Sequence, residues 1–202
     1  MKFYSQCGQD EYVVNYFKDK KGYYVDIGAN NGVTGSNTKI LEELGWCGIC
    51  IEPNPEIYKE LIKNRTCKCI EGAVSDLPDE YLDFCKINGY SEMLSGLLHT
   101  YNEDHKRRIL SEQQIYGGTR EKIKVRNYNF NVIENTTIDY LSIDTEGSEL
   151  NILKCIDFDK YKIKLITVEN NYNTEDLKNF LVPIGFKLLT TLSADEVYEN
   201  TL

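Results

Sequence analysis

The sequence predicts an α/β fold, with one mostly parallel sheet that carries helices on both faces. Short apolar runs typical of buried strands alternate along the chain with amphipathic stretches that have the spacing of helices. The chain has 202 residues, and no repeat, low-complexity tract or linker divides it. Because a compact domain usually has about 100–200 residues, we expect a single domain over residues 1–202.

The first half of the chain alternates strands with helices. The expected strands cover residues 23–27, 48–52, 67–71 and 82–87. Ile40, Leu41 and Leu44 have helical spacing, so a helix is expected over residues 38–44 and is stopped by Gly45. Asn54 and Pro55 are a typical helix start, a capping residue followed by a first-turn proline.

The second half repeats the pattern after a less regular segment. Residues 91–120 are polar and rich in turn residues, and their structure is the hardest to predict. Further strands are expected over residues 123–133, 140–144, 163–169 and 186–191, the first of them as an edge strand. Helices are expected over residues 148–155 and after Asn173, which is interpreted as a cap.

The charge balance argues against several partners. The chain has 23 basic and 32 acidic residues, a net charge of −9. Binding to nucleic acid or to an anionic membrane draws on a basic surface, so neither partner is expected. Residues 105–108 are the one basic cluster and are interpreted as a solvated helix face. No apolar run approaches the roughly 18 residues of a membrane span, and the first residues lack a signal region. We therefore expect a cytoplasmic protein, in its source cell or, if it is viral, in the host.

The cysteines are expected to be reduced thiols rather than a disulfide framework, because seven is an odd number and no secretion signal is present. Cys47 with Cys50, and Cys67 with Cys69, suggest zinc as an alternative. The spacing of the second pair does not fit a zinc knuckle, so core thiols are the preferred interpretation.

The strand ends carry the candidate binding residues, since ligands of parallel sheets bind at the carboxyl ends of the strands. The first strand runs into a turn that contains Gly28 and Gly32, where backbone can approach a ligand closely. Glu52, 20 residues beyond Gly32, ends the next strand, where an acid can accept hydrogen bonds from both ribose hydroxyls. The glycine spacing fits neither the dinucleotide fingerprint nor a phosphate-binding loop. It favours an adenosine cofactor without a pyrophosphate, such as S-adenosylmethionine, whose positive charges Asp26 and Asp144 would attract.

Six segments, in the same order, resemble those of the FkbM family of S-adenosylmethionine-dependent methyltransferases. They are YSQCGQD at 4–10, VDIGANNG at 25–32, IEPNP at 51–55, GAVSD at 72–76, DYLSIDTEGSE at 139–149 and ITVENNY at 166–172. One departure is Ser142, where many members of this family have lysine. The resemblance implies a Rossmann-like class I methyltransferase domain with a seven-stranded, mostly parallel sheet.

The resemblance also implies a set of cofactor-binding residues. Those around the methionine part would be Asp26, Gly28, Asn30 and Gly32, while Glu52 would hold the ribose. The adenine slot would be formed by Pro53, Asn54, Ala73 and Val74. Gln6, Gln9 and Asp10 would place a helical N-terminal segment, residues 1–20, over the site. For Gln6 and Asp10 the alternative is helix capping.

The candidate catalytic residues follow two later strands: Asp144 and Glu146 after one, Glu169 and Asn170 at the end of the other. A carboxylate could take the proton of an acceptor hydroxyl. Alternatively Asp144, Glu169 and Asn170 could bind Mg²⁺ or Mn²⁺ through oxygen ligands. A third interpretation is that Glu169 or Glu146 simply caps a helix or pairs with an arginine. Residues 88–122 are expected to be an acceptor-side insertion or lid, which could bring His99 or His105 to the site as a base.

These residues predict an O-methyltransferase that transfers a methyl group from S-adenosylmethionine to a hydroxyl, in particular of a sugar in a glycan. The acceptor would be a small molecule or a glycan, and the oligomeric state is left open. One alternative is a metal-dependent O-methyltransferase of small diols or catechols. Another is a cofactor-binding module without catalytic activity.

Overall fold

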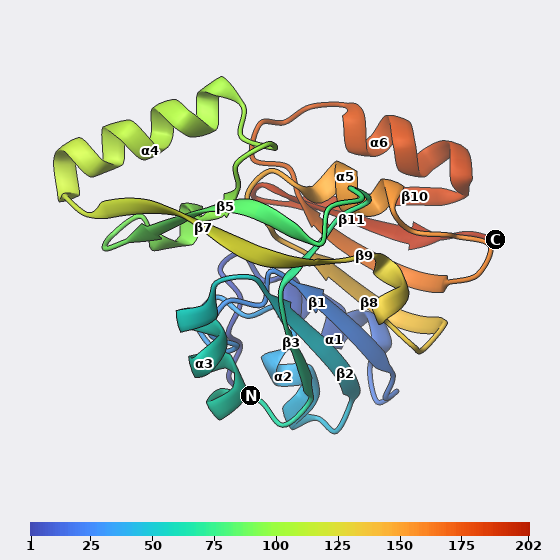
Figure 1. The fold of residues 1–202 in the computed structure, drawn as a ribbon. Coiled ribbons are helices and arrows are strands. Elements are labelled where there is room, and N and C mark those ends of the chain that lie inside the picture. Colours follow the sequence, from blue (N-terminus) through green and yellow to red (C-terminus); the bar gives the residue numbers. More distant parts are fainter.

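The computed structural model describes residues 1–202, and its main feature is a seven-stranded sheet (Figure 1). Its strands are β1 (Tyr23–Ile27), β2 (Cys47–Glu52), β3 (Lys68–Glu71), β8 (Thr137–Ile143), β9 (Lys162–Glu169), β10 (Phe186–Leu192) and β11 (Asp195–Asn200). They lie in the order β10-β11-β9-β8-β1-β2-β3, and β11 alone is antiparallel to its neighbours. The predicted fold class, a mostly parallel seven-stranded sheet, is confirmed.

Helices cover both faces of this sheet (Figure 1). The helices of one face are α1 (Gln9–Phe17), α2 (Lys39–Glu43) and α3 (Pro55–Asn64), and those of the other are α5 (Glu149–Lys154) and α6 (Asp176–Leu181). Side chains of a strand alternate between the faces, so Tyr24 of β1 packs with α1–α3, whereas Val25 and Ile27 pack with α5 and α6. The sheet therefore separates two apolar cores.

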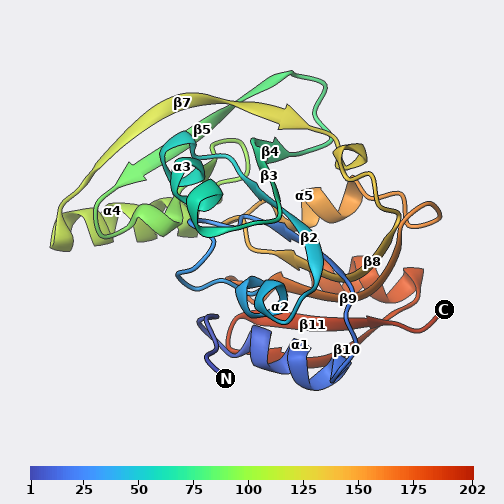
Figure 2. The ribbon, with the colours of Figure 1, turned by 90° about the horizontal axis from the view of Figure 1, so that it is seen from below.

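A second sheet lies at the carboxyl ends of the main strands (Figure 2). Its four strands, in spatial order, are β4 (Ala73–Val74), β7 (Thr119–Tyr128), β5 (Tyr81–Asn88) and β6 (Gly96–Leu97). Helix α4 (Glu103–Tyr116) joins β6 to β7, and three short 3₁₀ turns are η1 (Glu92–Leu94), η2 (Phe130–Val132) and η3 (Val182–Ile184). We call residues 73–128 the lid.

Two predictions for residues in and next to the lid were wrong. Residues 82–87 and 123–133 were expected to be strands of the main sheet, but β5 and β7 pair with each other, and η2 occupies residues 130–132. The apolar pattern of a short strand does not show which sheet it joins. The segment 88–122, expected to be an acceptor-side insertion or lid, supplies η1, β6, α4 and the start of β7.

Two features near the carboxyl terminus also differ from expectation. Strand β11 was not predicted, because Val197 and Tyr198 are its only apolar residues and its other residues are polar. Asn173 does not cap α6: it has a left-handed φ of 49°, and the helix begins at Asp176, after Glu175.

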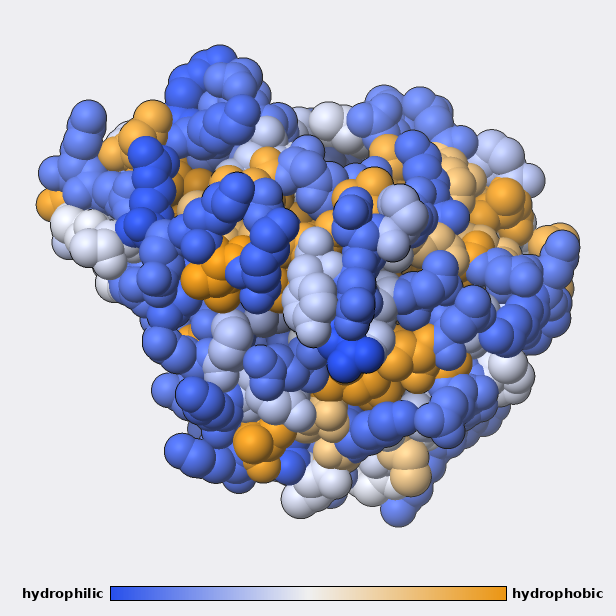
Figure 3. Space-filling model, viewed as in Figure 1, coloured by the Kyte–Doolittle hydropathy of each residue, from blue (hydrophilic) through white to orange (hydrophobic).

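The remaining surface is mostly hydrophilic. In the view of Figure 3, hydrophilic side chains cover most of the face and separate the hydrophobic patches from one another. None of the helices combines the length and the apolar character that crossing a membrane would require. All seven cysteines are free, and the Sγ atoms of Cys50 and Cys67 lie 3.6 Å apart between β2 and β3.

Candidate functional site

A cleft of about 1040 Å³ lies between the carboxyl ends of the main strands and the lid. Most of the predicted site residues line it. They are Gln6, Asp26, Gly28, Asn30, Glu52, Pro53, Asn54, Ala73, Val74, Asp144, Glu146 and Glu169. Their segments are far apart in the sequence, so the fold brings together what the strand-end rule predicted. We call this cavity the first cleft.

Gly28 allows the turn after β1 to cross the end of β8. Its φ of +87° is a left-handed conformation, and a Cβ atom at this position would lie 1.7 Å from the carbonyl oxygen of Asp144. No side chain fits there, because that distance is far below contact distance. The backbone N–H of Gly28 donates to the carbonyl of Ile51, at 3.0 Å. The turn is thus fastened to β2 and pressed against β8.

Glu52 is held by two backbone groups at the end of β2. One carboxylate oxygen accepts from the N–H of Asn30, at 3.0 Å, and the other from the N–H of Asn54, at 2.8 Å. Burial raises the pKa of Glu52 to about 7, although both hydrogen bonds act in the opposite direction. Each carboxylate oxygen can accept a further hydrogen bond. Glu52 is therefore a fixed acceptor pair in the wall of the first cleft.

The two ends of the first cleft differ in chemistry. Ala73, Val74 and Phe84 make one part of the wall apolar. In another part Asp26 accepts a hydrogen bond from the hydroxyl of Thr38, at 2.5 Å, and burial raises the pKa of its carboxyl. The cleft can therefore take a ligand that is flat and apolar at one end and cationic at the other.

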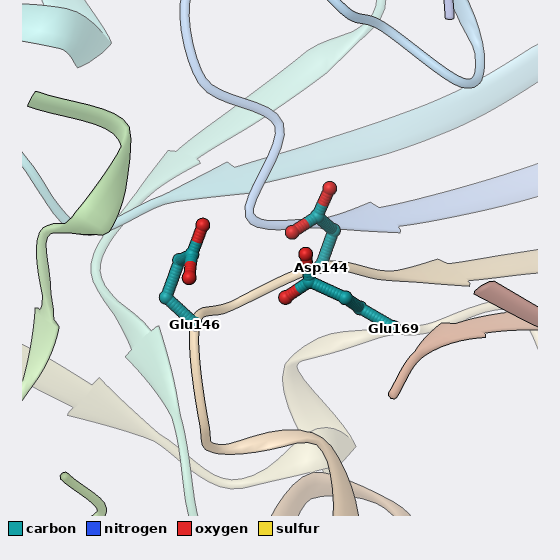
Figure 4. A group of neighbouring side chains, drawn as sticks. All are labelled: Asp144, Glu146 and Glu169. Carbon is teal, nitrogen blue, oxygen red and sulfur yellow. The ribbon is translucent and has the colours of Figure 1, made fainter. Parts of the chain in front are cut away.

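Three carboxylates converge at the acidic end (Figure 4). Asp144 follows β8, Glu146 comes two residues later, and Glu169 ends β9; one oxygen from each lies within 4.8 Å of the other two. Burial raises the pKa of all three. For Asp144 and Glu169 the neighbouring carboxylates are the next cause. All three members of the cluster are acids, so it favours protons or a bound cation.

The backbone around Glu146 is unusual. Glu146 has a left-handed φ of 57°, and Gly147 follows with a φ of 115°. The carboxylate of Glu149 braces this turn by accepting from the N–H groups of Thr145 and Gly147, each at 3.0 Å. Such conformations cost energy and cluster at functional sites. Glu149 was not among the predicted site residues, because it lies within α5 rather than at a strand end.

A second cleft of about 950 Å³ opens on the other side of the carboxylates, between α4, α5 and the segment after β9. It shares Glu146 and Glu169 with the first cleft. The lid brings both histidines to its wall, as one of the predictions for this segment allowed. Two cavities therefore meet at two carboxylates.

His105 is buried in the wall of the second cleft and held on both ring nitrogens. Its Nε2 lies 3.1 Å from the carbonyl oxygen of Leu94, and its Nδ1 lies 2.9 Å from the hydroxyl of Tyr172. Nε2 therefore carries the proton, and Tyr172 donates to Nδ1. Burial lowers the pKa of His105, which keeps the ring neutral. Nδ1 is also 3.8 Å from a carboxylate oxygen of Glu146. Nothing in the sequence around Tyr172 predicted its contact with His105.

Four predicted site residues lie outside the first cleft: Gln9, Asp10, Gly32 and Asn170. The carboxylate of Asp10 accepts from the N–H of Tyr4, at 2.6 Å, and so fastens the N-terminal segment. It also accepts from the N–H of Glu11 in the first turn of α1, at 2.8 Å, although the N-cap residue is Gly8. A Cβ on Gly32 would clash with Leu61 and Arg65 at 2.6 Å, so this glycine faces α3. Asn170 donates to the carboxylate of Glu196, at 2.9 Å. It follows Glu169 directly, and it lines the second cleft rather than the first.

Glu146 consequently occupies the place in the carboxylate cluster that was expected for Asn170. The N-terminal segment also differs in detail from expectation. Helix α1 packs on a face of the sheet, where Gln9 donates to Asp195 of β11, and only Gln6 of the three predicted residues lines the first cleft.

The sheet order and the cleft at the strand ends define a class I methyltransferase fold. The chain belongs to the FkbM methyltransferase family, because a family model described as "Methyltransferase FkbM domain" matches residues 26–192. No curated protein matches the chain.

Solved structures share the fold at low sequence identity. The FkbM methyltransferase of Methylobacillus flagellatus is 14% identical, with a TM-score of 0.50, over 93% of this chain and 47% of the other. This chain thus spans about half the length of that protein. The METTL16 methyltransferase domain is 12% identical (TM-score 0.48; 96% and 65% covered). A TehB-like S-adenosylmethionine-dependent methyltransferase from Corynebacterium glutamicum is 10% identical (TM-score 0.47; 99% and 89% covered).

Proposed function

We propose that this chain transfers a methyl group from S-adenosylmethionine to a hydroxyl group, in particular of a sugar in a glycan. The observation that carries the proposal is the meeting of two cavities at Glu146 and Glu169. A methyltransferase needs one cavity for its cofactor and one for its acceptor, with a proton acceptor at their junction. The first cleft would hold the cofactor and the second the acceptor.

The chemistry of the first cleft fits S-adenosylmethionine. Glu52 would bind the two ribose hydroxyls, for which its two oxygens are free to accept. The apolar wall at Ala73, Val74 and Phe84 suits an adenine ring. Asp26 and Asp144 would attract the ammonium and sulfonium charges, because opposite charge stabilises a cation in a buried site. When bound, the cofactor supplies a methyl group on a positively charged sulfur.

Glu146 is the proposed general base. It reaches both clefts, and its pKa is raised to about 7, which suits proton transfer near neutral pH. The buried, neutral His105 lies beside it and adds no competing positive charge. Burial and the neighbouring carboxylates raise the pKa of Glu169, so it would keep its proton and leave proton transfer to Glu146. Asn170 would position the segment after β9 through its bond to Glu196.

A metal-dependent mechanism is the second candidate, and the carboxylate cluster is the observation that favours it. Asp144, Glu146 and Glu169 form an all-oxygen set of the kind that Mg²⁺ or Mn²⁺ prefers. Such an ion would hold two neighbouring hydroxyls of a diol or catechol at the junction of the clefts. A rate that survives treatment with EDTA would exclude this mechanism, while a rate restored only by Mg²⁺ or Mn²⁺ would support it.

The test of the proposal is a transfer experiment with labelled S-adenosylmethionine. Glycans and small diols are incubated with the protein, and mass spectrometry locates the labelled methyl group. We expect the label on a hydroxyl oxygen of a sugar. Calorimetry with S-adenosylhomocysteine provides the control: saturable binding without any transfer would indicate an inert cofactor-binding module, and no binding would overturn the cofactor assignment.

A further inference from the structure

The second cleft has a strongly acidic wall. Its charged side chains are Glu146, Glu149, Glu169 and Asp176, and neither a lysine nor an arginine lines it. His105, one of the two histidines in the wall, has both ring nitrogens beside uncharged groups, the carbonyl of Leu94 and the hydroxyl of Tyr172. This wall therefore favours a cationic ligand over an anionic one.

The guanidinium that acts on this cleft is that of Arg108 on α4. It lowers the pKa of Glu146 from outside the wall. Its charge is partly neutralised, since its Nε lies 3.0 Å from the carboxylate of Glu112. The other basic residues of α4 face acids of the same helix: Lys106 is 2.8 Å from Glu103, and Arg107 is 3.3 Å from Asp104. The lid thus adds little positive charge to the wall of the second cleft.

The uncharged part of the wall consists of amides, hydroxyls and an aromatic ring. The amide of Asn171 donates to Glu146, at 3.4 Å, and Asn102 and Asn151 also line the cleft. The ring of Tyr172 lies beside them. Amides bind hydroxyl groups from either side, and a tyrosine ring covers an apolar sugar face. The wall is therefore suited to a ligand with many hydroxyls.

From this wall we infer that the acceptor is an amino sugar with a free, protonated amine, and that acidic sugars are rejected. This inference rests on the proposed function, because it takes the second cleft as the acceptor site. A protonated amine would find carboxylates on the wall without a competing cation. A uronic acid or a phosphorylated sugar would be desolvated against like charges, which disfavours its binding.

The experiment compares oligosaccharides that differ at one position, which is a hexosamine, a hexose or a hexuronate. Labelled methyl transfer is measured for each, together with binding of S-adenosylhomocysteine by calorimetry. We expect transfer to the hexosamine to exceed transfer to the hexuronate by about tenfold or more, with the hexose between them. The hexosamine-to-hexuronate ratio should decrease in 1 M salt, because the Debye length is then only about 3 Å and charges farther apart are screened.

Two variants test whether the wall charge causes this preference. Asp176→Lys reverses one charge of the second cleft and should lower the hexosamine-to-hexuronate ratio by about three- to tenfold. Asp159→Lys makes the same change at an exposed position outside both clefts and should leave the ratio unchanged. Thermal melting shows whether both variants fold.

The possible results separate the inference from the function on which it rests. Equal or better transfer to the hexuronate would overturn the inference, and so would transfer to none of the glycans while S-adenosylhomocysteine still binds. A ratio that Asp176→Lys leaves unchanged in a folded protein would also overturn it. Failure of S-adenosylhomocysteine to bind would instead overturn the proposed function.

Discussion

The carboxylate of Glu52 accepts a hydrogen bond of 3.0 Å from the backbone N–H of Asn30. This bond ties the end of β2 to the turn after β1, so an acid and a glycine-rich turn that are far apart in the sequence form one wall. The same carboxylate is buried and has no basic partner in its hydrogen bonds. Its orientation is therefore set before any ligand arrives.

Replacing Glu52 by alanine should weaken the binding of S-adenosylhomocysteine by about 1–3 kcal/mol, through loss of charged hydrogen bonds to the ribose. Titration calorimetry measures this loss. Glu71→Ala is the matched control, because Glu71 is the register partner of Glu52 on β3 but is exposed and outside the cleft. Wild-type affinity in Glu52→Ala would contradict the ribose assignment.

The raised pKa of Glu52 predicts a pH dependence of stability. Its pKa of about 7 in the folded protein lies above the ordinary value of 4.5, so the protonated form is favoured by folding. The resulting stability is fully present below pH 4.5 and is lost as the pH rises through about 7. Glu52→Gln should therefore reduce the difference in Tm between pH 5 and pH 8, to an extent measurable by calorimetry. An unchanged difference would show that this carboxyl titrates normally.

Gly28→Ala should destabilise the fold by about 2 kcal/mol or more, because a Cβ atom would lie 1.7 Å from the carbonyl of Asp144. Gly8→Ala is the control: its φ of +84° and ψ of 17° are also left-handed, but nothing lies within 4 Å of its Cβ position. The control variant should lose only about 1–2 kcal/mol of folding stability, which is the ordinary cost of a left-handed conformation for alanine. Chemical denaturation measures the folding stability of both variants. Equal losses of stability would contradict the close approach of Gly28 to the carbonyl of Asp144.

Glu146→Gln should lower kcat by about 100-fold or more and leave the affinity for S-adenosylhomocysteine within about twofold, if Glu146 takes the acceptor proton. In the wild-type protein kcat/KM should rise with pH up to about 7, and this limb should disappear in the variant. Steady-state kinetics across pH 5.5–9 tests both. A variant that keeps its rate and its pH profile would assign the proton to another group.

Much of the main sheet could be predicted, because local patterns determine its elements. Strand β1 is a short apolar run, and α3 begins where Asn54 accepts a hydrogen bond from the N–H of Glu56, as its sequence indicated. Strand β11 could not be predicted in the same way, since its burial depends on pairing between β9 and β10. The second sheet was missed for the same reason: pairing of β5 with β7 is a long-range choice.

The site was predictable where a strand end determines the position, and less so elsewhere. Glu52 and Asp144 follow from the rule that ligands lie at the carboxyl ends of parallel strands. Asn170, the residue after β9, lies outside the carboxylate cluster and lines the second cleft. The contact of His105 with Tyr172 arises only when α4 packs over the segment after β9. No local pattern contains that information.

A crystal structure with S-adenosylhomocysteine tests the central claim most directly. The account predicts density in the first cleft, with both ribose hydroxyls within hydrogen-bond distance of the Glu52 carboxylate and the homocysteine part toward Asp26 and Asp144. Density for the nucleoside at any other place on the protein would contradict it.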